Sequence, residues 1–201
     1  MEEYRKTDGT RVQAHTRQAH CRKIESHSYF RNSTAQKVKN LKTSIKPWKD
    51  SEKEIVSNAL SELPGWLKRY AFKEILRADV GFHPSNPAAT VPQTKTLVIF
   101  DNFFHLKNKK DVLTHELSHV AFYDFSPNEL MSFALASGWV LTQNARFPPK
   151  KLLESDSSQS ISEDFASHIE HFYRDEEALM LSHPMSDLII RRLIESKETT
   201  L

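Results

Sequence analysis

The 201-residue sequence predicts an α+β fold that is mostly helical and carries a short β-sheet. Two observations support this prediction. Apolar residues recur at helical spacing through most of the chain after residue 49, and helix-capping patterns precede several of these stretches. One short run, Thr96–Phe100 (TLVIF), is instead β-branched and apolar, as is typical of a strand.

The first predicted elements are two helices separated by a break at Pro64. Ser51 and Glu54 form a capping-box pattern that opens the first helix. The second is expected over Trp66–Arg77, where apolar residues lie three and four apart. The segment 80–92 is rich in Pro, Asn, Ser and Thr and is expected to be a loop before the strand.

The second half of the chain is predicted to be helical. Ser126, Pro127 and Glu129 form a strong helix start, with a cap, a proline at the first helical position and a completed box. Residues 150–160 (KKLLESDSSQS) are expected to form a polar loop. The expected helices span about 111–123, 127–141, 163–174 and 176–181, and a last one begins near residue 183.

The charge distribution divides the chain at about residue 48. Residues 1–50 carry 12 Lys+Arg against 5 Asp+Glu, whereas residues 51–201 carry 16 against 21. Residues 1–48 are therefore predicted to be a basic, partly disordered leader or linker, and 49–201 one domain. The basic part lacks the interleaved aromatic residues of a nucleic-acid reader, so no nucleic-acid partner is expected.

Cysteine content and hydropathy narrow the class of protein further. The one cysteine, Cys21, excludes an internal disulfide and a multi-cysteine metal site. No apolar run approaches the roughly 18 residues that span a bilayer, and the N-terminus lacks the apolar segment of a signal peptide. A soluble protein is expected, with its localisation unassigned and export by a specialised secretion system left open.

The segment His115-Glu116-Leu117-Ser118-His119 carries the strongest chemical signal. Two histidines four apart share one face of a helix, with Cβ atoms about 5–6 Å apart, and can bind one tetrahedral Zn²⁺. Glu116 is offset by about 100° and is suited to act as general base on a metal-activated water. The alternative is an ordinary amphipathic helix with two surface histidines, because apolar residues line its other face.

A catalytic zinc usually has a third protein ligand, and Glu163 is the leading candidate. Ser160 and Glu163 also form a capping pattern, so Glu163 has the alternative role of a helix cap. Glu170 lies seven residues after Glu163 on the same helix face and is the substitute ligand. His168 and His171 are further candidates. The strand at 96–100 precedes the histidine helix and is either an edge strand for a peptide substrate or plain core.

HELSH followed by Glu163-Asp164-Phe165-Ala166 resembles the gluzincin pattern of zinc metallopeptidases. The form E-x-F-A is similar to the lethal-factor type of toxin metallopeptidase. The resemblance covers roughly residues 95–175 and implies a small zincin-like domain. It also implies that His115, His119 and Glu163 bind Zn²⁺ and that Glu116 is the general base.

The sequence departs from that family at two places. Family members carry a carboxylate four residues past the ligand glutamate, where this chain has Ser167, so Asp164 or Asp124 is needed to orient a zinc-binding histidine. The family's oxyanion-stabilising tyrosine before the ligand glutamate is also missing. The candidates to replace it are Tyr173, His171 and His183.

The expected function is that of a zinc-dependent endopeptidase acting on a protein or peptide. A weak similarity of residues 8–17 to segments that precede domains in secreted bacterial toxins points to an exported effector or toxin. Two alternatives remain. One is a cell-wall peptide amidase with the same zinc chemistry, and the other is a non-catalytic metal-binding or helical interaction domain.

Overall fold

The computed structural model describes residues 4–5, 11–12, 45–79, 81 and 85–199, and it confirms the predicted α+β, mostly helical class. The chain separates into two units, residues 1–34 and 35–201. In the first, β1 (Tyr4–Arg5) pairs antiparallel with β2 (Arg11–Val12). Most of the predicted leader lies outside the described residues, and its disorder stays a prediction.

A three-stranded mixed sheet lies at one side of the second unit. Its strands are β3 (Glu74–Arg77), β4 (Ala88–Val91) and β5 (Thr96–Ile99), in the order β3-β5-β4. β3 runs parallel to β5, and β4 antiparallel. The predicted strand is confirmed as β5, but it is central and fully buried rather than an edge strand.

Two sequence predictions before the sheet are wrong. The helix expected over Trp66–Arg77 is only the short α3 (Gly65–Lys68), and the rest of that segment includes β3. The expected loop 80–92 contains β4. In both segments, pairing with β5 supplies backbone hydrogen bonds. This pairing outweighs the local sequence preference for a helix at 74–77 and for a loop at 88–91.

Residues 45–48, which the predicted boundary places in the leader, contact β3 and the residue that follows it. Ile45 forms an antiparallel bridge with Ala78, and Trp48 Nε1 donates to the carbonyl of Ile75 at 3.2 Å. The predicted first helix follows as α2 (Asp50–Ser61). Its N-cap is Lys49, two residues before the expected Ser51, and the Lys49 amide donates to the Glu52 carboxylate, so Ser51 and Glu54 do not form the predicted capping box.

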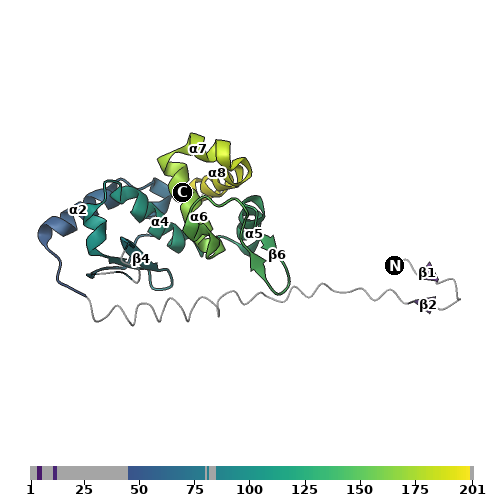
Figure 1. Cartoon of the computed structure of the whole chain (residues 1–201), viewed down its shortest axis with the longest axis horizontal. Helices are drawn as coiled ribbons and strands as arrows, with labels where there is room; N and C mark the ends of the chain where they lie inside the picture. The colour runs from purple at the N-terminus through teal and green to yellow at the C-terminus, as the bar shows by residue number, and fades with distance from the viewer. Residues whose placement is uncertain (1–3, 6–10, 13–44, 80, 82–84, 200–201) are drawn as a thin grey trace. The chain divides into compact units, whose positions relative to one another are not determined.

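The remaining predicted helices are present. They are α4 (Lys109–Phe122), α5 (Pro127–Ala136), α6 (Ile161–Arg174), α7 (Glu176–Ser182) and α8 (Pro184–Glu198), with 3-10 turns η1 (Asp101–His105) and η2 (Ser155–Ser158). Figure 1 shows α4 and α6 side by side at the centre of this unit, with α7 and α8 at one end. Within the described residues, no helix has the length and apolar character that a membrane crossing requires.

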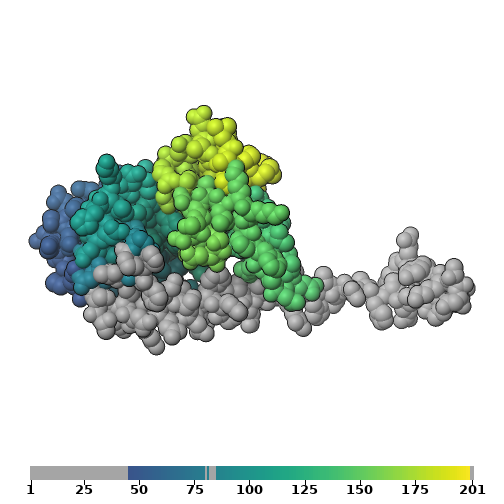
Figure 2. Space-filling view, in the orientation of Figure 1, coloured from purple at the N-terminus to yellow at the C-terminus, as the bar shows by residue number. Residues whose placement is uncertain are grey.

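Phe165 of α6 forms the centre of the core between α4, α5 and α6. It is fully buried, and its ring packs edge-on against Phe122, Phe125 and Phe133 at centroid distances of 5.3–5.5 Å. Aromatic contacts of this kind add to the energy of burial and restrict ring orientation. The packing therefore sets how α6 lies against α4. In Figure 2 the green α5 to α6 region lies next to the teal α4 region.

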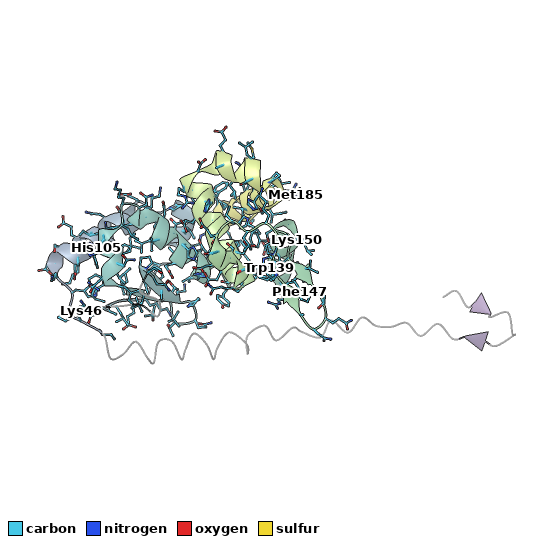
Figure 3. The ribbon with its side chains drawn as sticks, viewed as in Figure 1. Lys46, His105, Trp139, Phe147, Lys150 and Met185 are labelled. Atoms are coloured by element: carbon cyan, nitrogen blue, oxygen red, sulfur yellow. The ribbon has the colours of Figure 1, made fainter. Side chains whose placement is uncertain are left out.

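A small hairpin follows α5 and interrupts the helix that was expected to reach residue 141. Gly138 has φ +95°, a backbone conformation that ends the helix, and β6 (Val140–Leu141) then pairs with β7 (Arg146–Phe147). Buried Trp139 donates from Nε1 to Asp164 Oδ2 at 2.9 Å and ties the base of the hairpin to α6. Phe147 is exposed on the hairpin (Figure 3).

Gly138→Ala is predicted to destabilise the fold by about 1–3 kcal/mol, because a side chain is strained at this positive φ and its Cβ would lie 3.3 Å from Pro149. Gly65→Ala is the matched control, since a Cβ there meets no atom within 4 Å. It should leave stability unchanged or raise it slightly. Urea unfolding of both variants measures the difference, and equal stabilities would contradict the assigned backbone conformation.

Candidate metal centre

His115 and His119 on α4 and Glu163 on α6 form a compact group of metal-ligating side chains. Their ligand atoms lie within 4.8 Å of one another. Glu163 Oε2 is 3.4 Å from His115 Nε2 and 3.4 Å from His119 Nε2, and the two imidazole rings are 5.0 Å apart. Among the residues with described positions, this is the one His, Cys, Asp and Glu group with such geometry.

The local sequence of α6 separates the two roles proposed for Glu163. Ser160 is the N-cap, and its Oγ accepts from the Glu163 amide at 3.1 Å. The side chain of Glu163 does not turn back to the cap but reaches toward the two histidines. The backbone of Glu163 is thus part of the helix start, while its carboxylate remains available to a metal ion.

Each histidine has a second partner at Nδ1, the nitrogen that faces away from Glu163. His115 Nδ1 lies 3.2 Å from Glu170 Oε2, and His119 Nδ1 lies 3.0 Å from Ser162 Oγ. Such contacts hold an imidazole in one orientation and leave Nε2 for the metal. Arg174 donates to the other oxygen of Glu170 at 2.9 Å and balances its charge.

Glu170 therefore takes the role that the sequence analysis gave to Asp164 or Asp124. It lies two helical turns past Glu163, instead of at the position of Ser167, which is buried. From the sequence, Glu170 was predicted only as a substitute ligand, although its seven-residue spacing from Glu163 places both residues on one face of the helix. Ser162 was not identified, because a serine beside a helix start usually has a capping function.

The other residues named from the sequence are engaged elsewhere. Asp164 accepts from Trp139, and Asp124 accepts from Tyr70. The Tyr173 hydroxyl accepts from Trp66 at 2.7 Å. His171 contacts Glu154, while His168 contacts the Asp164 carbonyl and packs against His183. Within the described part of the chain, none of these residues makes a hydrogen bond, ion pair or ring contact with His115 or His119.

The charges of His115 and Glu163 compensate each other when no metal ion is bound. Burial lowers the pKa of His115, but hydrogen bonds with Glu163 and Glu170 outweigh this and raise that pKa to about 10. Burial raises the pKa of Glu163, but the charge of His119 and hydrogen bonds from both histidines hold it far below its usual value. At neutral pH the metal-free group is an ion pair of a protonated imidazole and a carboxylate.

Glu116 lies in the same turn of α4 as His115 and is 9% exposed. Its charge contributes to the raised pKa of His115. Within the described residues its carboxylate makes no hydrogen bond or ion pair, and its oxygens are not among the fully buried polar atoms. It is therefore free to accept a proton from a molecule that enters the site.

The chain matches no protein-family model, and comparisons with curated proteins and with solved structures return no match. His115, His119 and Glu163 form a group that can bind one metal ion, and the carboxylate of Glu116 lies beside it without a hydrogen-bond partner among the described residues.

Glu163→Ala is predicted to weaken metal binding by at least about 100-fold, since it removes one of three ligands. Ser160→Ala is the matched control, because it removes only the cap and should cost about 0.5–2 kcal/mol of stability with little change in metal affinity. Competition titrations with a zinc-sensitive chelator measure both. Similar losses in the two variants would show that Glu163 acts only as a cap.

Binding of a divalent metal ion, tested with Zn²⁺, is predicted to release about one proton per ion near pH 7, since His115 with a pKa of about 10 must lose its proton to become a ligand. Affinity should therefore rise with pH from 6 toward that value. Calorimetry in buffers of different ionisation enthalpy counts the protons. A pH-independent affinity would show that His115 is neutral in the metal-free protein.

Proposed function

We propose that this protein is a zinc-dependent peptidase of gluzincin type, with His115, His119 and Glu163 as the zinc ligands and Glu116 as the general base. The observation that carries the proposal is the unpaired, nearly buried Glu116 beside a two-histidine, one-glutamate group. A purely structural metal site has no use for such a carboxylate. Structural zinc sites usually have four protein ligands, whereas catalytic ones keep a position open.

The three ligand atoms are of the kinds that zinc binds, and the two contacts of Glu163 have the spacing expected of zinc ligands. Zn–N and Zn–O bonds of about 2.0–2.2 Å at tetrahedral angles place neighbouring ligand atoms about 3.4 Å apart. The two distances from Glu163 Oε2 to the imidazole nitrogens are both 3.4 Å. Nitrogen ligands with a single carboxylate also favour zinc over calcium or magnesium, which prefer oxygen ligands.

A zinc ion held by His115, His119 and Glu163 would supply a Lewis acid that lowers the pKa of water and polarises a carbonyl group. Glu116 accepts a proton from the attacking water and returns it to the leaving nitrogen, a task that requires a carboxylate with no competing partner. Glu170 and Ser162 hold the two imidazoles in place during these steps. Arg174 donates to the other oxygen of Glu170 and helps to direct its carboxylate at His115.

A peptide is the substrate that the surroundings favour. Of the two roles left open for the strand at 96–100, β5 has that of a core strand, and among the described residues β4 is the strand next to α4 with an unpaired edge. Among the described residues β4 pairs only with β5, so its outer backbone groups can bind an extended peptide by strand addition. The resemblance to toxin metallopeptidases extends the proposal to a secreted effector that cleaves a protein.

Glu116→Gln is predicted to retain bound zinc and to reduce peptide hydrolysis by at least about 100-fold, because the amide cannot accept the proton. Glu177→Gln is the control, since Glu177 is an exposed glutamate on α7. Cleavage of a peptide library and of peptidoglycan stem peptides by the zinc-loaded protein is followed by mass spectrometry. Hydrolysis of stem peptides alone would favour the amidase alternative. Undiminished hydrolysis by Glu116→Gln would remove Glu116 from the mechanism.

A further inference from the structure

The hairpin after α5 has an apolar face that the described residues leave largely uncovered. Val140 of β6 and Phe147 of β7 are cross-strand partners, so their side chains lie on the same face of the ribbon. They are 57% and 53% exposed, and the ribbon pairs with no other described strand. Figure 1 shows it extending away from the helices. Because a two-stranded ribbon buries little by itself, this face is available to a surface outside the chain.

The ribbon is nevertheless held in a defined position. At its base, Trp139 is buried and donates to Asp164 of α6 at 2.9 Å. At its turn, the Ala145 amide donates to Thr142 Oγ1 at 2.9 Å. An exposed face that is fixed in this way loses little conformational freedom when it binds.

The exposed apolar surface continues from the ribbon to α7 and α8. Lys151 Nζ donates to the carbonyl of Ser182 at 2.7 Å, so the loop after β7 lies against the end of α7. Figure 3 shows Phe147, Lys150 and Met185 in succession along one edge of the unit. We define the exposed apolar residues of this edge as the apolar strip: Val140, Phe147, Leu152, Leu181 and Met185.

The charged residues of this segment all have the same sign. Residues 130–153 contain no Asp or Glu and carry three cations, Arg146, Lys150 and Lys151. Because three of the 16 Lys+Arg of residues 51–201 lie here, the rest of that range is acidic, with 13 Lys+Arg against 21 Asp+Glu. Arg146 and Lys150 are exposed, and their side chains make no hydrogen bond or ion pair with a described residue.

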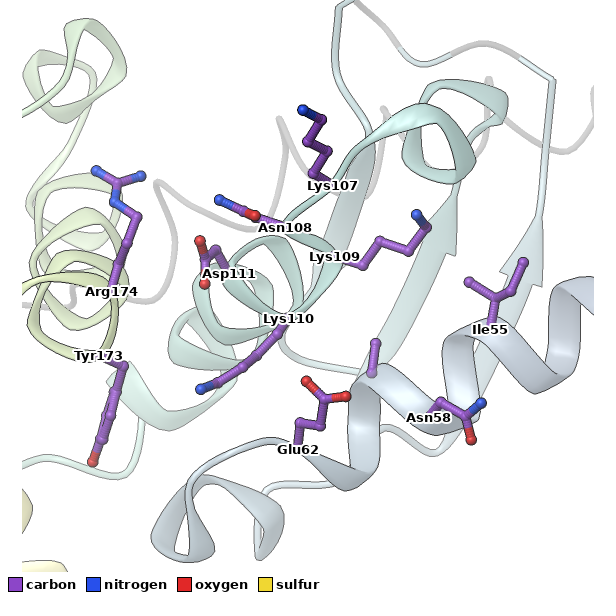
Figure 4. Close-up of a pocket in the computed structure, with 11 residues that line it drawn as sticks. Ile55, Asn58, Glu62, Lys107, Asn108, Lys109, Lys110, Asp111, Tyr173 and Arg174 are labelled. Carbon is purple, nitrogen blue, oxygen red and sulfur yellow. The ribbon is translucent and has the colours of Figure 1, made fainter.

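The acidic residues on either side of this segment are already engaged. Glu129 accepts from the amide at the start of α5, and Glu154 contacts His171. Elsewhere on the surface, the hollow between α2, α4 and α6 mixes lysines with Glu62 and Asp111 (Figure 4). The apolar strip instead combines exposed apolar side chains with free cations. That combination complements a surface that is anionic outside and apolar beneath.

We propose that the apolar strip and its three cations form a peripheral contact with an anionic lipid surface. The apolar side chains enter the region just below the head groups, and Arg146, Lys150 and Lys151 contact lipid phosphates. Lys151 retains two N–H donors beside the one that faces Ser182. A lipid layer is favoured over a protein partner because it adapts to a projecting ribbon without a matching groove. This contact is independent of the metal group and of any hydrolysis there.

Flotation of the full-length protein with vesicles tests the apolar part of the contact. Vesicles of phosphatidylcholine mixed with phosphatidylglycerol should bind the protein at least about tenfold more strongly than vesicles of phosphatidylcholine alone. Val140→Ser/Phe147→Ser should weaken binding to the mixed vesicles by about tenfold or more, since it removes apolar area that the lipid covers. Ile55→Ser/Tyr123→Ser is the matched control, because both side chains are exposed and lie outside the strip.

A second pair of variants tests the charges. Arg146→Gln/Lys150→Gln should weaken binding to the mixed vesicles by about tenfold or more. Lys73→Gln/Lys107→Gln removes the same charge from exposed positions outside the strip and should have little effect. All variants keep the basic residues 1–50, so their own attraction to lipid is common to every measurement. No binding to mixed vesicles, or equal binding by strip and control variants, would overturn the proposal.

Sedimentation equilibrium separates the lipid contact from an interface between two copies of the chain. The natural sequence should be a monomer without vesicles, and circular dichroism of each variant confirms folding. A dimer that Val140→Ser/Phe147→Ser dissociates, together with no vesicle binding, would assign the strip to a second copy and refute the lipid contact.

Discussion

The packing of α4 against α6 is the constraint on which the rest of the structure depends. Phe165 fills the space between these helices and meets three other phenylalanines. Ser162 and Glu163 precede Phe165 on α6. Across the interface, Ser162 contacts His119 and Glu163 contacts His115. A slide of α6 by one residue, about 1.5 Å along its axis and 100° around it, would remove both contacts at once. The buried ring thus determines the position of the carboxylate.

α4 and α6 run in opposite directions, and a row of polar contacts joins their facing sides. Ser162 meets His119, Glu163 meets both histidines, and Glu170 meets His115. Partly buried charges are stabilised when they are paired. The protonated His115 pairs with Glu163 in the metal-free protein, so both charges have a partner before a metal ion binds.

Much of the α-helical part could be predicted from the sequence, because its signals are local. The start of α5 at Ser126-Pro127 and the apolar spacing of α4 depend on residues within a few positions of each other. The sheet could not be predicted in the same way. Glu74–Arg77 has helical spacing and Ala88–Val91 lies in a proline-rich segment, yet both become strands because β5 offers them partners. β5 is therefore the central strand, and among the described residues β4 has an edge that pairs with no other strand.

The sequence by itself determined the ligand types and the pairing of His115 with His119, because a helix brings positions four apart to one face whatever surrounds it. Only the tertiary structure decided that the Glu163 side chain points at the histidines instead of the helix cap, and that Glu170 holds His115. Those contacts join residues 48 and 55 positions apart in the chain. Their distance and direction depend on how two helices pack, which no local pattern specifies.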